Sequence, residues 1–252
     1  MITAIVQARM GSTRLPGKVL IDIQGKPLLE HVMDRVGMTR LIDRIVIATT
    51  VNEKDKAVIE FAKNLSIPYY VGSEDDVLDR FYQAARKFGA NIIVRITPDC
   101  PMIDPHVIDE VIERYLKGDY DYVANTLKRT YPDGLDVEVF SYKALEKAWK
   151  EARWFSEREH VTPYIWKNPD KFRLSTVESE VNLSHLRWTV DEESDLQFVR
   201  EVYRHIYKEG DIFYMEDVLN LLAKHPELKQ INQGIATNEG YAKSLREDKI
   251  VR

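Results

Sequence analysis

The feature that most constrains the fold is an alternation, over the first half of the chain, of short β-branched runs with longer segments of helical periodicity. The runs that predict strands cover residues 2–8, 44–50, 68–72, 91–96 and 120–125. The segments that repeat apolar residues at the i, i+3, i+4, i+7 spacing of a helix packed on a sheet cover residues 28–38, 54–65, 76–89 and 105–118. This alternation predicts βαβ units around a mostly parallel central sheet, and therefore an α/β fold.

The pattern changes after residue 125. A Pro-Asp-Gly turn at residues 132–134 precedes a run of alternating apolar and polar residues, which is typical of a strand. Two helical segments and another strand-like run follow it before residue 183. We interpret residues 126–183 as an insertion that leaves the sheet, with a β-hairpin and helices, and not as a second domain.

The last part of the chain returns to the main domain. Residues 186–191 predict a returning strand, and the periodicity of residues 193–210 and 215–228 predicts two helices. The tail, residues 232–252, is polar and poorly periodic, so we expect it to be partly disordered. A chain of 252 residues that is 44% hydrophobic can bury one large core, and we expect residues 1–231 to form one domain.

The composition excludes several classes of partner. Lys and Arg number 36 against 41 Asp and Glu, so the net charge of −5 provides no overall basic field for a nucleic acid or an anionic membrane surface. No apolar run approaches the ~18 residues that would span a membrane. The one cysteine, Cys100, excludes an internal disulfide framework and a thiolate metal cluster. We therefore expect a cytoplasmic protein that recognises any phosphate group locally.

Residues 7–20, QARMGSTRLPGKVL, follow the first predicted strand and are rich in cations and hydroxyl groups. In an open α/β sheet, the loop after the first strand is the favoured place for phosphate groups. Gly11 lets the backbone approach a ligand, and the cations of the loop can neutralise several phosphate charges. The alternative is an ordinary solvated basic loop, which is the weaker interpretation for three cations clustered in an acidic chain. The loop has neither Walker A nor dinucleotide-binding spacing.

This loop resembles the A-R-x-x-S-x-R-x-P-x-K signature of the cytidylyltransferases that make CMP-sugars, the CMP-Kdo and CMP-sialate synthetases. Further segments are similar to the spore-coat polysaccharide biosynthesis protein F branch of that superfamily, among them EDDVLDRFYQAA (74–85), VRITPDCPMIDP (94–105), DGLDVEVF (133–140), EREHVTPYI (157–165) and LRWTVDEESDLQFV (186–199). The resemblance covers about residues 1–222. It implies a three-layer Rossmann-like nucleotide-diphospho-sugar transferase fold, CTP as a substrate, dependence on Mg²⁺, and a homodimer built through the inserted segment.

Asp99 and Asp191 are the candidate metal ligands. Transfer of a nucleotide to an acceptor oxygen needs a divalent cation, and each of these residues follows a predicted strand. The resemblance implies that both bind Mg²⁺, and the absence of paired His or Cys ligands favours Mg²⁺ over zinc. The alternative is a helix N-cap: Asp191 could cap the helix that follows it, and Asp104 is expected to cap the helix that begins at Pro105.

The resemblance also implies which residues contact the two substrates. Nucleotide contacts are expected from Ala8, Arg9, Gly11, Ser12, Arg14, Lys18, Thr49, Ser73 and Arg80, with Arg9, Lys18 and Asp99 as the catalytic groups. Acceptor contacts are expected from Asp136, Glu138, Arg158, Glu159 and His160. Arg80 could instead be a surface residue of an amphipathic helix, and His160 a satisfied, partly buried histidine. Ser156 and Glu159 could form a capping box at the start of a helix.

These observations lead to one functional hypothesis. Residues 1–231 would form a Mg²⁺-dependent cytidylyltransferase domain that transfers CMP from CTP to a sugar-type or phosphorylated acceptor in surface polysaccharide or glycan biosynthesis, with release of pyrophosphate. Because a cluster of buried carboxylates disfavours an acidic sugar, a neutral or cationic acceptor is expected. Two alternatives stay open: a nucleotide-sugar-dependent glycosyltransferase on a similar fold, and a nucleotide-binding protein without catalytic activity.

Overall fold

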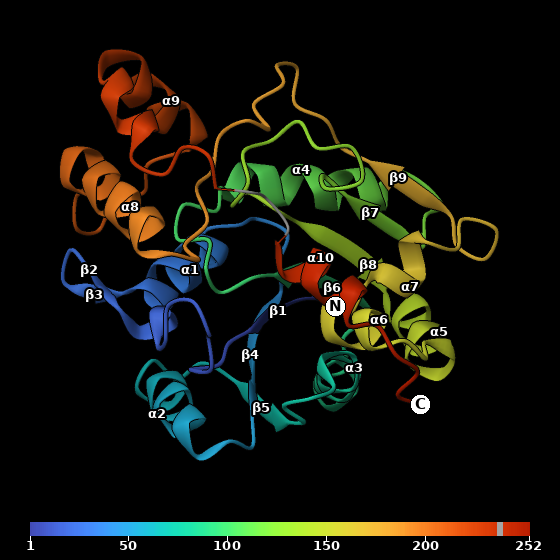
Figure 1. Cartoon of the computed structure of the whole chain (residues 1–252). Helices are drawn as coiled ribbons and strands as arrows, with labels where there is room; N and C mark the ends of the chain where they lie inside the picture. The colour runs from blue at the N-terminus through green and yellow to red at the C-terminus, as the bar shows by residue number, and fades with distance from the viewer. Residues whose placement is uncertain (236–238) are drawn as a thin grey trace.

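The computed structural model of the chain describes residues 1–235 and 239–252. Within these residues the central sheet has seven strands in the order β5-β4-β1-β6-β8-β7-β9 (Figure 1). They are β1 (Ile2–Gln7), β4 (Arg44–Thr50), β5 (Tyr69–Gly72), β6 (Ile92–Ile96), β7 (Tyr122–Ala124), β8 (Glu138–Ser141) and β9 (Leu174–Thr176). A separate hairpin pairs β2 (Asp22–Ile23) with β3 (Lys26–Pro27). The strands predicted for the first half of the chain are confirmed.

Helices fill most of the connections. They are α1 (Leu28–Gly37), α2 (Lys56–Asn64), α3 (Val77–Phe88), α4 (Pro105–Leu116), α5 (Tyr142–Glu151), α6 (Phe155–His160), α7 (Pro163–Trp166), α8 (Glu193–Ile206), α9 (Met215–Lys224) and α10 (Glu239–Arg246). Short 3-10 helices lie at Lys18–Leu20, Glu53–Asp55 and Pro226–Gln230. The cap predicted at Asp104 is confirmed, since its carboxylate accepts the NH of His106 at 2.8 Å. In the described part of the chain, no helix has the length and apolar character needed to cross a membrane.

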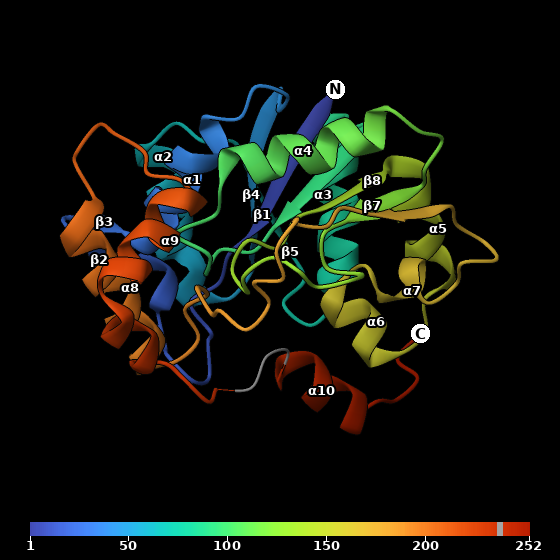
Figure 2. The same ribbon diagram turned by 90° about the horizontal axis from the view of Figure 1, so that it is seen from above.

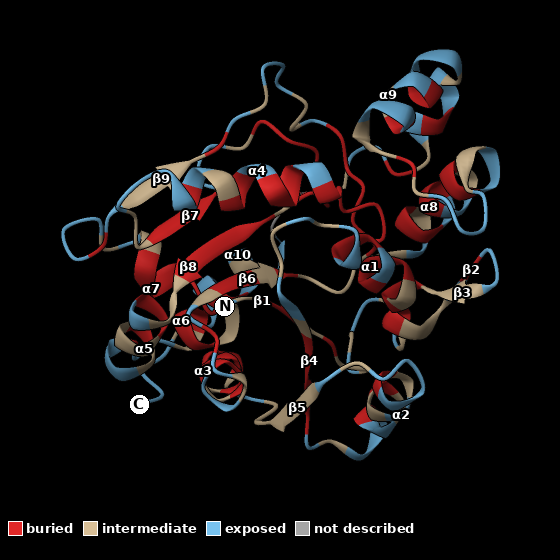
Figure 3. Cartoon of the chain, turned by 180° about the vertical axis from the view of Figure 1, so that it is seen from behind, coloured by how far each residue is buried: buried red, intermediate tan, exposed pale blue. Residues whose placement is uncertain are grey.

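Helices cover both faces of the sheet, which gives three layers (Figure 1 and Figure 2). Alternate residues of β1 point to opposite faces: Ala4 and Val6 pack in a core with α1, α2, α4, α8 and α9, whereas Ile5 packs with α3, α5 and α7. The central strands are buried between these helices (Figure 3). Each fully buried valine or isoleucine contributes roughly 1.5–3 kcal/mol to folding. The predicted α/β fold is confirmed, and its mostly apolar central strands are typical of a sheet covered on both faces.

The site lies at the carboxyl ends of the central parallel strands. β1 pairs in parallel with β4 on one side and with β6 on the other. The chain therefore leaves β1 towards one half of the sheet and later returns to the other half. A crevice forms at such a switch point, and ligands of open α/β sheets bind there. The loop that follows β1 and the loop that follows β6 both begin at this edge.

The expectation that residues 126–183 leave the sheet is wrong. β8, which belongs to this block, lies between β6 and β7 and is antiparallel to both, and β9 adds an edge strand parallel to β7. Val137 and Val139 are fully buried on the side of α4, so the alternation that predicted a strand is correct. The pattern identifies the buried face of a strand but not the sheet that it joins.

Residues 186–191 do not form the predicted strand. A single bridge pairs Arg187 with Asp133, and the NH of Val190 donates to the carbonyl oxygen of Asp99 at 2.8 Å. The partners of this segment are a turn and a loop, so a continuous ladder of hydrogen bonds cannot form.

The expectation of disorder in the tail is wrong for Glu239–Arg246, which form α10. This helix contacts α6 and lies outside the layers of the main sheet (Figure 2). Polar residues predominate in it because only one face packs on the protein.

Candidate active site

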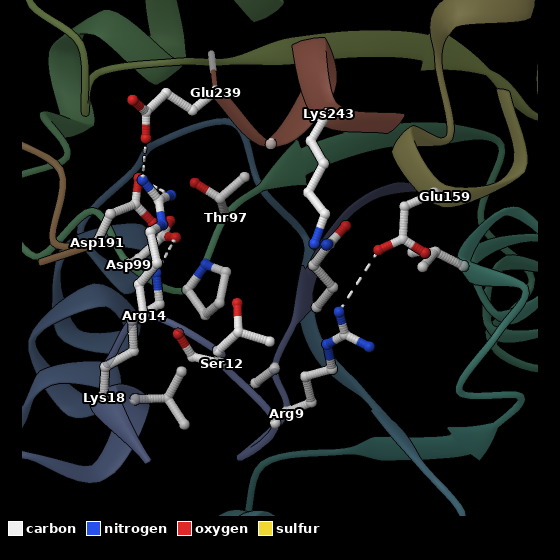
Figure 4. A pocket seen from close by; sticks show the side chains of 18 of the residues that line it. Arg9, Ser12, Arg14, Lys18, Thr97, Asp99, Glu159, Asp191, Glu239 and Lys243 are labelled. Atoms are coloured by element: carbon white, nitrogen blue, oxygen red, sulfur yellow. Dashed lines mark hydrogen bonds and ion pairs between the residues drawn. The ribbon is translucent and has the colours of Figure 1, made fainter. Parts of the chain in front are cut away.

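A cavity of about 730 Å³, the first cavity, opens over the carboxyl end of β1 (Figure 4). The predicted site residues that line it are Ala8, Arg9, Gly11, Ser12, Arg14, Lys18, Arg80, Asp99, Glu159 and Asp191. Among the described residues, six Arg and Lys side chains and four carboxylates line this cavity. The cations are in excess, so the site is locally basic although the whole chain is acidic.

Lys18 joins Asp99 and Asp191 in this cavity. Its Nζ donates to Asp99 Oδ2 at 2.7 Å, to Asp191 Oδ1 at 2.8 Å and to the carbonyl oxygen of Val190 at 2.8 Å. The side chain of Lys18 is only 9% exposed. The two carboxylates lie 81 and 173 positions further along the chain, and they meet on one ammonium group.

The charges of this cluster favour its ionised form. Burial by itself lowers the pKa of Lys18, but the charges of Asp99 and Asp191 outweigh it and raise this pKa above its ordinary value. Burial by itself raises the pKa of Asp191, but the surrounding cations, Lys18 first, outweigh it and lower this pKa. At neutral pH the cluster therefore contains an ammonium group and an ionised Asp191.

Arg187 fixes the position of Asp191. Its guanidinium donates twice to Asp195 at 2.9 Å, and it also donates to Asp133 at 3.0 Å. Its Nη2 donates to Asp191 at 3.1 Å. The alternative that Asp191 is a helix cap is wrong, because the carboxylate of Asp195 accepts the NH groups of Asp191 and Glu192 before α8. The carboxylate of Asp191 instead lines the cavity.

Arg9 and Arg14 reach into the first cavity and are already paired with carboxylates (Figure 4). Arg14 lies 2.9 Å from Asp191 Oδ2 and 2.9 Å from Glu239 Oε2. Arg9 Nη2 donates to Glu159 Oε1 at 3.5 Å. These pairs are partly exposed, and such pairs contribute little to stability, so phosphate oxygens can replace the carboxylates at small cost.

The other expected nucleotide contacts divide into two groups. Arg80 is buried and lines the cavity from α3, so the alternative of a surface residue is wrong. Burial, together with the charge of Arg9, lowers the pKa of Arg80 to about 10, which leaves it charged at neutral pH. Thr49 and Ser73 are not among the described residues that line the cavity. Thr49 is buried in β4, and Ser73 Oγ accepts the NH of Asp76 before α3.

A second cavity, of about 540 Å³, adjoins the first. The residues that line both are Arg14, Thr97, Asp99, Asp191, Glu239 and Gly240. The second cavity is further lined by residues of β8, α6, α7 and the loop before β8. Its aromatic lining residues are Trp166 of α7 and Tyr241 of α10. The two cavities therefore meet at the carboxylates that Lys18 holds.

Three of the expected acceptor residues, Asp136, Glu138 and His160, line the second cavity. Asp136 accepts two hydrogen bonds from the guanidinium of Arg129, at 3.1 and 2.8 Å. Glu138, which is 6% exposed, forms an ion pair with Arg95. The predicted alternation holds, since both carboxylates point away from the buried valines of this strand.

His160 lies between the second cavity and α10. Its Nε2 is 2.9 Å from Ser244 Oγ, and its ring meets the ring of Tyr241 edge to face. Burial, with the nearby charge of Arg95, lowers the pKa of His160 to about 4, so the ring is neutral at neutral pH. His160 is therefore a partly buried histidine whose Nε2 already has a hydrogen-bond partner, as the alternative proposed.

Arg158 and Glu159 lie elsewhere. Arg158 is 2% exposed and its Nε donates to Asp76 at 2.8 Å, so it ties α6 to the start of α3 and is not among the described lining residues of either cavity. Glu159 lines the first cavity, where its partner is Arg9, and it does not line the second.

The predicted capping box at Ser156 and Glu159 is wrong. The helix α6 begins at Phe155, and the carboxylate of Glu157 accepts the NH groups of Arg153 and Trp154, at 3.0 and 3.2 Å. Ser156 lies inside the helix.

Val161 ends α6 in a conformation that is rare for a β-branched residue. Its φ is 71° and its ψ is −56°, and the NH of Thr162 donates to the carbonyl oxygen of His160 at 2.8 Å, which closes a γ-turn. Such a conformation costs about 1–3 kcal/mol, and complete burial of the Val161 side chain offsets this cost. The turn splits the helical segment predicted here and leaves His160 and Thr162 lining the second cavity.

The donor set of Asp99 and Asp191 suits Mg²⁺. Both supply hard carboxylate oxygens, and Mg²⁺ is commonly held by one or two carboxylates together with substrate phosphates. In the part of the chain that the structure describes, no three His, Cys, Asp or Glu side chains are grouped as a metal site. The pair therefore fits an ion that shares its coordination with a bound substrate.

The contribution of the tail to the first cavity was not predicted from the sequence. Glu239, Lys243 and Arg246 line the first cavity, although they belong to a segment that was expected to be partly disordered. A signal was present, because Glu239 and Lys243 are four residues apart and so share one face of a helix.

Comparison with known proteins agrees with this geometry. A family profile described as "Cytidylyltransferase" matches residues 3–239. The chain is 37% identical over 238 residues to an uncharacterized protein of Methanocaldococcus jannaschii, which covers 93% of this chain and 95% of that protein. It is 31% identical over 238 residues to spore coat polysaccharide biosynthesis protein SpsF of Bacillus subtilis, with 90% and 95% covered.

A solved structure of a cytidylyltransferase from Leptospira borgpetersenii superposes with a TM-score of 0.87 at 31% identity, and the match covers 93% of this chain and 98% of that chain. The chain is thus a nucleotidyltransferase, and it belongs to the cytidylyltransferase family, on the branch that includes spore coat polysaccharide biosynthesis protein SpsF.

Proposed function

We propose that the protein transfers CMP from CTP to a hydroxyl group of a sugar-type acceptor and releases pyrophosphate. The observation that carries this proposal is the junction of the two cavities at Asp99 and Asp191. A nucleotide in the first cavity and an acceptor in the second would meet there. The reacting phosphorus must lie at such a junction, because the acceptor oxygen attacks it from the side opposite the leaving group.

The first loop supports the binding of a triphosphate. Charge-assisted hydrogen bonds from Arg and Lys to phosphate are among the strongest in proteins. Arg9, Arg14 and Lys18 would neutralise the charge that develops on pyrophosphate as it leaves. A bond forms from the acceptor oxygen to the α-phosphorus, the bond from this phosphorus to the bridging oxygen breaks so that pyrophosphate leaves with the electron pair, and the hydroxyl proton passes to solvent water. Positioning and charge neutralisation suffice, without a covalent intermediate on the protein.

Asp99 and Asp191 would hold Mg²⁺. When bound, this ion neutralises phosphate oxygens and lowers the pKa of a coordinated hydroxyl group. Lys18 prepares the two carboxylates for this role, since it keeps them close together and lowers the pKa of Asp191. A site whose ligands are already oriented loses less conformational entropy when the substrates arrive.

The second cavity supports a neutral or cationic sugar rather than an acidic one. Arg95 and Arg129 face this cavity, but each is already paired with a carboxylate, Glu138 and Asp136. If an acidic acceptor captured Arg95, the buried carboxylate of Glu138 would lose its cationic partner, which is strongly unfavourable. The ring of Trp166 offers an apolar surface for the C–H face of a sugar.

The first test is thermal denaturation in the presence of each nucleoside triphosphate. Binding to the native state raises the melting temperature by mass action, so CTP should raise it more than GTP, UTP or ATP. Pyrophosphate release should then be followed with CTP, Mg²⁺ and a panel of neutral, amino and acidic sugars. Equal stabilisation by all four nucleotides, or no pyrophosphate release with any acceptor, would contradict the proposal.

The second test is Asp99→Asn, with Asp170→Asn as the matched control. Asp170 is exposed and lines neither cavity, so its variant should keep the activity of the wild type. Asp99→Asn should reduce pyrophosphate release at least about 100-fold, the usual effect of removing a group that stabilises transition-state charge. Full activity of this variant would exclude Asp99 from the reaction.

A further inference from the structure

The C-terminal helix α10 forms a wall of the first cavity. Its residues Glu239, Gly240, Ala242, Lys243 and Arg246 line that cavity. The match to the cytidylyltransferase family ends at residue 239, so nearly all of this helix lies outside the segment that the family profile describes. The contribution of α10 is therefore not explained by membership of the family.

The segment after α10 is attached to α6 by specific contacts. Asp248 accepts hydrogen bonds from the NH and the hydroxyl group of Ser156, at 2.9 and 2.8 Å. The NH of Phe155 donates to the carbonyl oxygen of Lys249 at 2.9 Å. Ser244 of α10 is buried against His160. These contacts hold the helix in one orientation over the cavity.

Glu239 and Lys243 occupy the same face of α10, and both point into the first cavity (Figure 4). The carboxylate of Glu239 lies 2.9 Å from Arg14, a phosphate-binding candidate. Lys243 has a weak partner, Glu247, at 4.0 Å, and its side chain is 62% exposed. The helix thus presents to the cavity one carboxylate that is paired with a loop arginine and one ammonium group that is nearly unpaired.

We propose that α10 belongs to the nucleotide site: Lys243 binds the phosphates of the nucleotide, and Glu239 competes with these phosphates for Arg14. This inference rests on the nucleotide binding proposed above. The two side chains have opposite effects because they carry opposite charges on the same wall. Lys243 adds a positive charge for the triphosphate, whereas Glu239 holds the arginine that a phosphate oxygen must capture.

The test measures the dissociation constants of CTP and of cytidine by isothermal titration calorimetry, using full-length variants. Lys243→Gln should weaken CTP binding about tenfold, the effect of one charge-assisted hydrogen bond, and leave cytidine binding unchanged. Glu239→Gln should strengthen CTP binding several-fold, because it removes the competing charge. Lys63→Gln and Glu180→Gln change the same charges at exposed positions that line neither cavity, and they should match the wild type.

The opposite signs separate a direct contact from a structural effect. If the helix only supported the fold, both variants would weaken CTP and cytidine alike. Unchanged CTP binding in Lys243→Gln, or weaker CTP binding in Glu239→Gln, would overturn this inference while the proposed function stood. If the wild type itself bound no CTP, the proposed function would fail first.

Discussion

Lys18 is the residue on which the geometry of the site depends most. A nearly buried cation contacts two carboxylates that are about one-fifth exposed, at 20% and 22%. Lys18→Gln would leave Asp99 and Asp191 close together without their common partner. Removal of one partner of a buried ion pair is strongly destabilising, so we expect the free energy of unfolding to fall by about 2 kcal/mol after allowance for the partial exposure. Urea denaturation measures this change.

The exposed Lys63 of α2 supplies the matched control for this prediction. Lys63→Gln removes the same charge far from a buried partner and should change the free energy of unfolding by less than about 0.5 kcal/mol. Equal stability of Lys18→Gln and the wild type would mean that the two carboxylates do not need the ammonium group.

His160 predicts a pH dependence of stability. Its pKa is about 4 in the folded chain against 6.5 ordinarily. Between these values the unfolded chain binds more protons, so the free energy of unfolding falls as the pH falls from about 6.5 to 4, and His160 causes no pH dependence above that window. Because the ring is partly exposed, we expect a loss of about 2 kcal/mol over this range, absent from His160→Gln. Urea denaturation at pH 7 and pH 4.5 tests this, and parallel losses in both proteins would contradict it.

The spacing of charged residues along the sequence identified some residues of the site but not others. Arg9, Arg14 and Lys18 could be identified from the sequence because three cations follow one strand in an acidic chain. Arg158 could not be excluded in the same way. Its charge is that of a typical binding residue. Only the fold shows that its guanidinium pairs with Asp76 and does not reach either cavity.

At the scale of elements, the turn at residues 132–134 supports the segment that carries Asp191. Gly134 has a φ of 113°, and a Cβ at this position would lie 2.6 Å from the carbonyl carbon of Trp188 and 2.7 Å from the nitrogen of Thr189. Gly134→Ala should therefore lower the free energy of unfolding by about 3 kcal/mol, through backbone strain and a clash with backbone atoms that cannot move aside. Thermal or urea denaturation measures the loss.

Gly210 supplies the control, because its φ is 80° but no atom lies within 4 Å of an added Cβ. Gly210→Ala carries only the conformational cost, about 1 kcal/mol. Similar losses in the two variants would show that the contact with residues 188 and 189 does not matter.

Helices were predicted correctly where apolar residues repeated at helical spacing over several turns. The helices α1, α3 and α4 begin and end within two residues of their predicted bounds, since their apolar spacing reports which side is buried. The helical segment from residue 156 was predicted as one helix and is two, because the γ-turn at Val161 leaves no signature in a single sequence. The strand predicted at residues 186–191 failed because its partners are a turn and a loop.

At the scale of the whole molecule, the homodimer stays a prediction. The resemblance to CMP-sugar synthetases implies one, and exposed apolar side chains in the block 126–183, Leu127 at 39% and Val181 at 63%, are available for a contact. Sedimentation equilibrium should then give twice the chain mass of 29.4 kDa, and Val181→Asp should reduce it towards that mass. A mass of one chain at all concentrations would contradict this prediction.

The α/β architecture and the basic loop after the first strand could be predicted from the sequence, because local periodicity and residue chemistry depend on consecutive positions. Asp99 and Asp191 became candidates chiefly through the resemblance to CMP-sugar synthetases. The tertiary structure alone decided that both carboxylates meet on Lys18, that β8 enters the sheet, and that α10 walls the first cavity. These results depend on contacts between distant segments. Which distant segments come into contact depends on how the apolar faces of all the helices and strands are buried together. No single stretch of sequence specifies this.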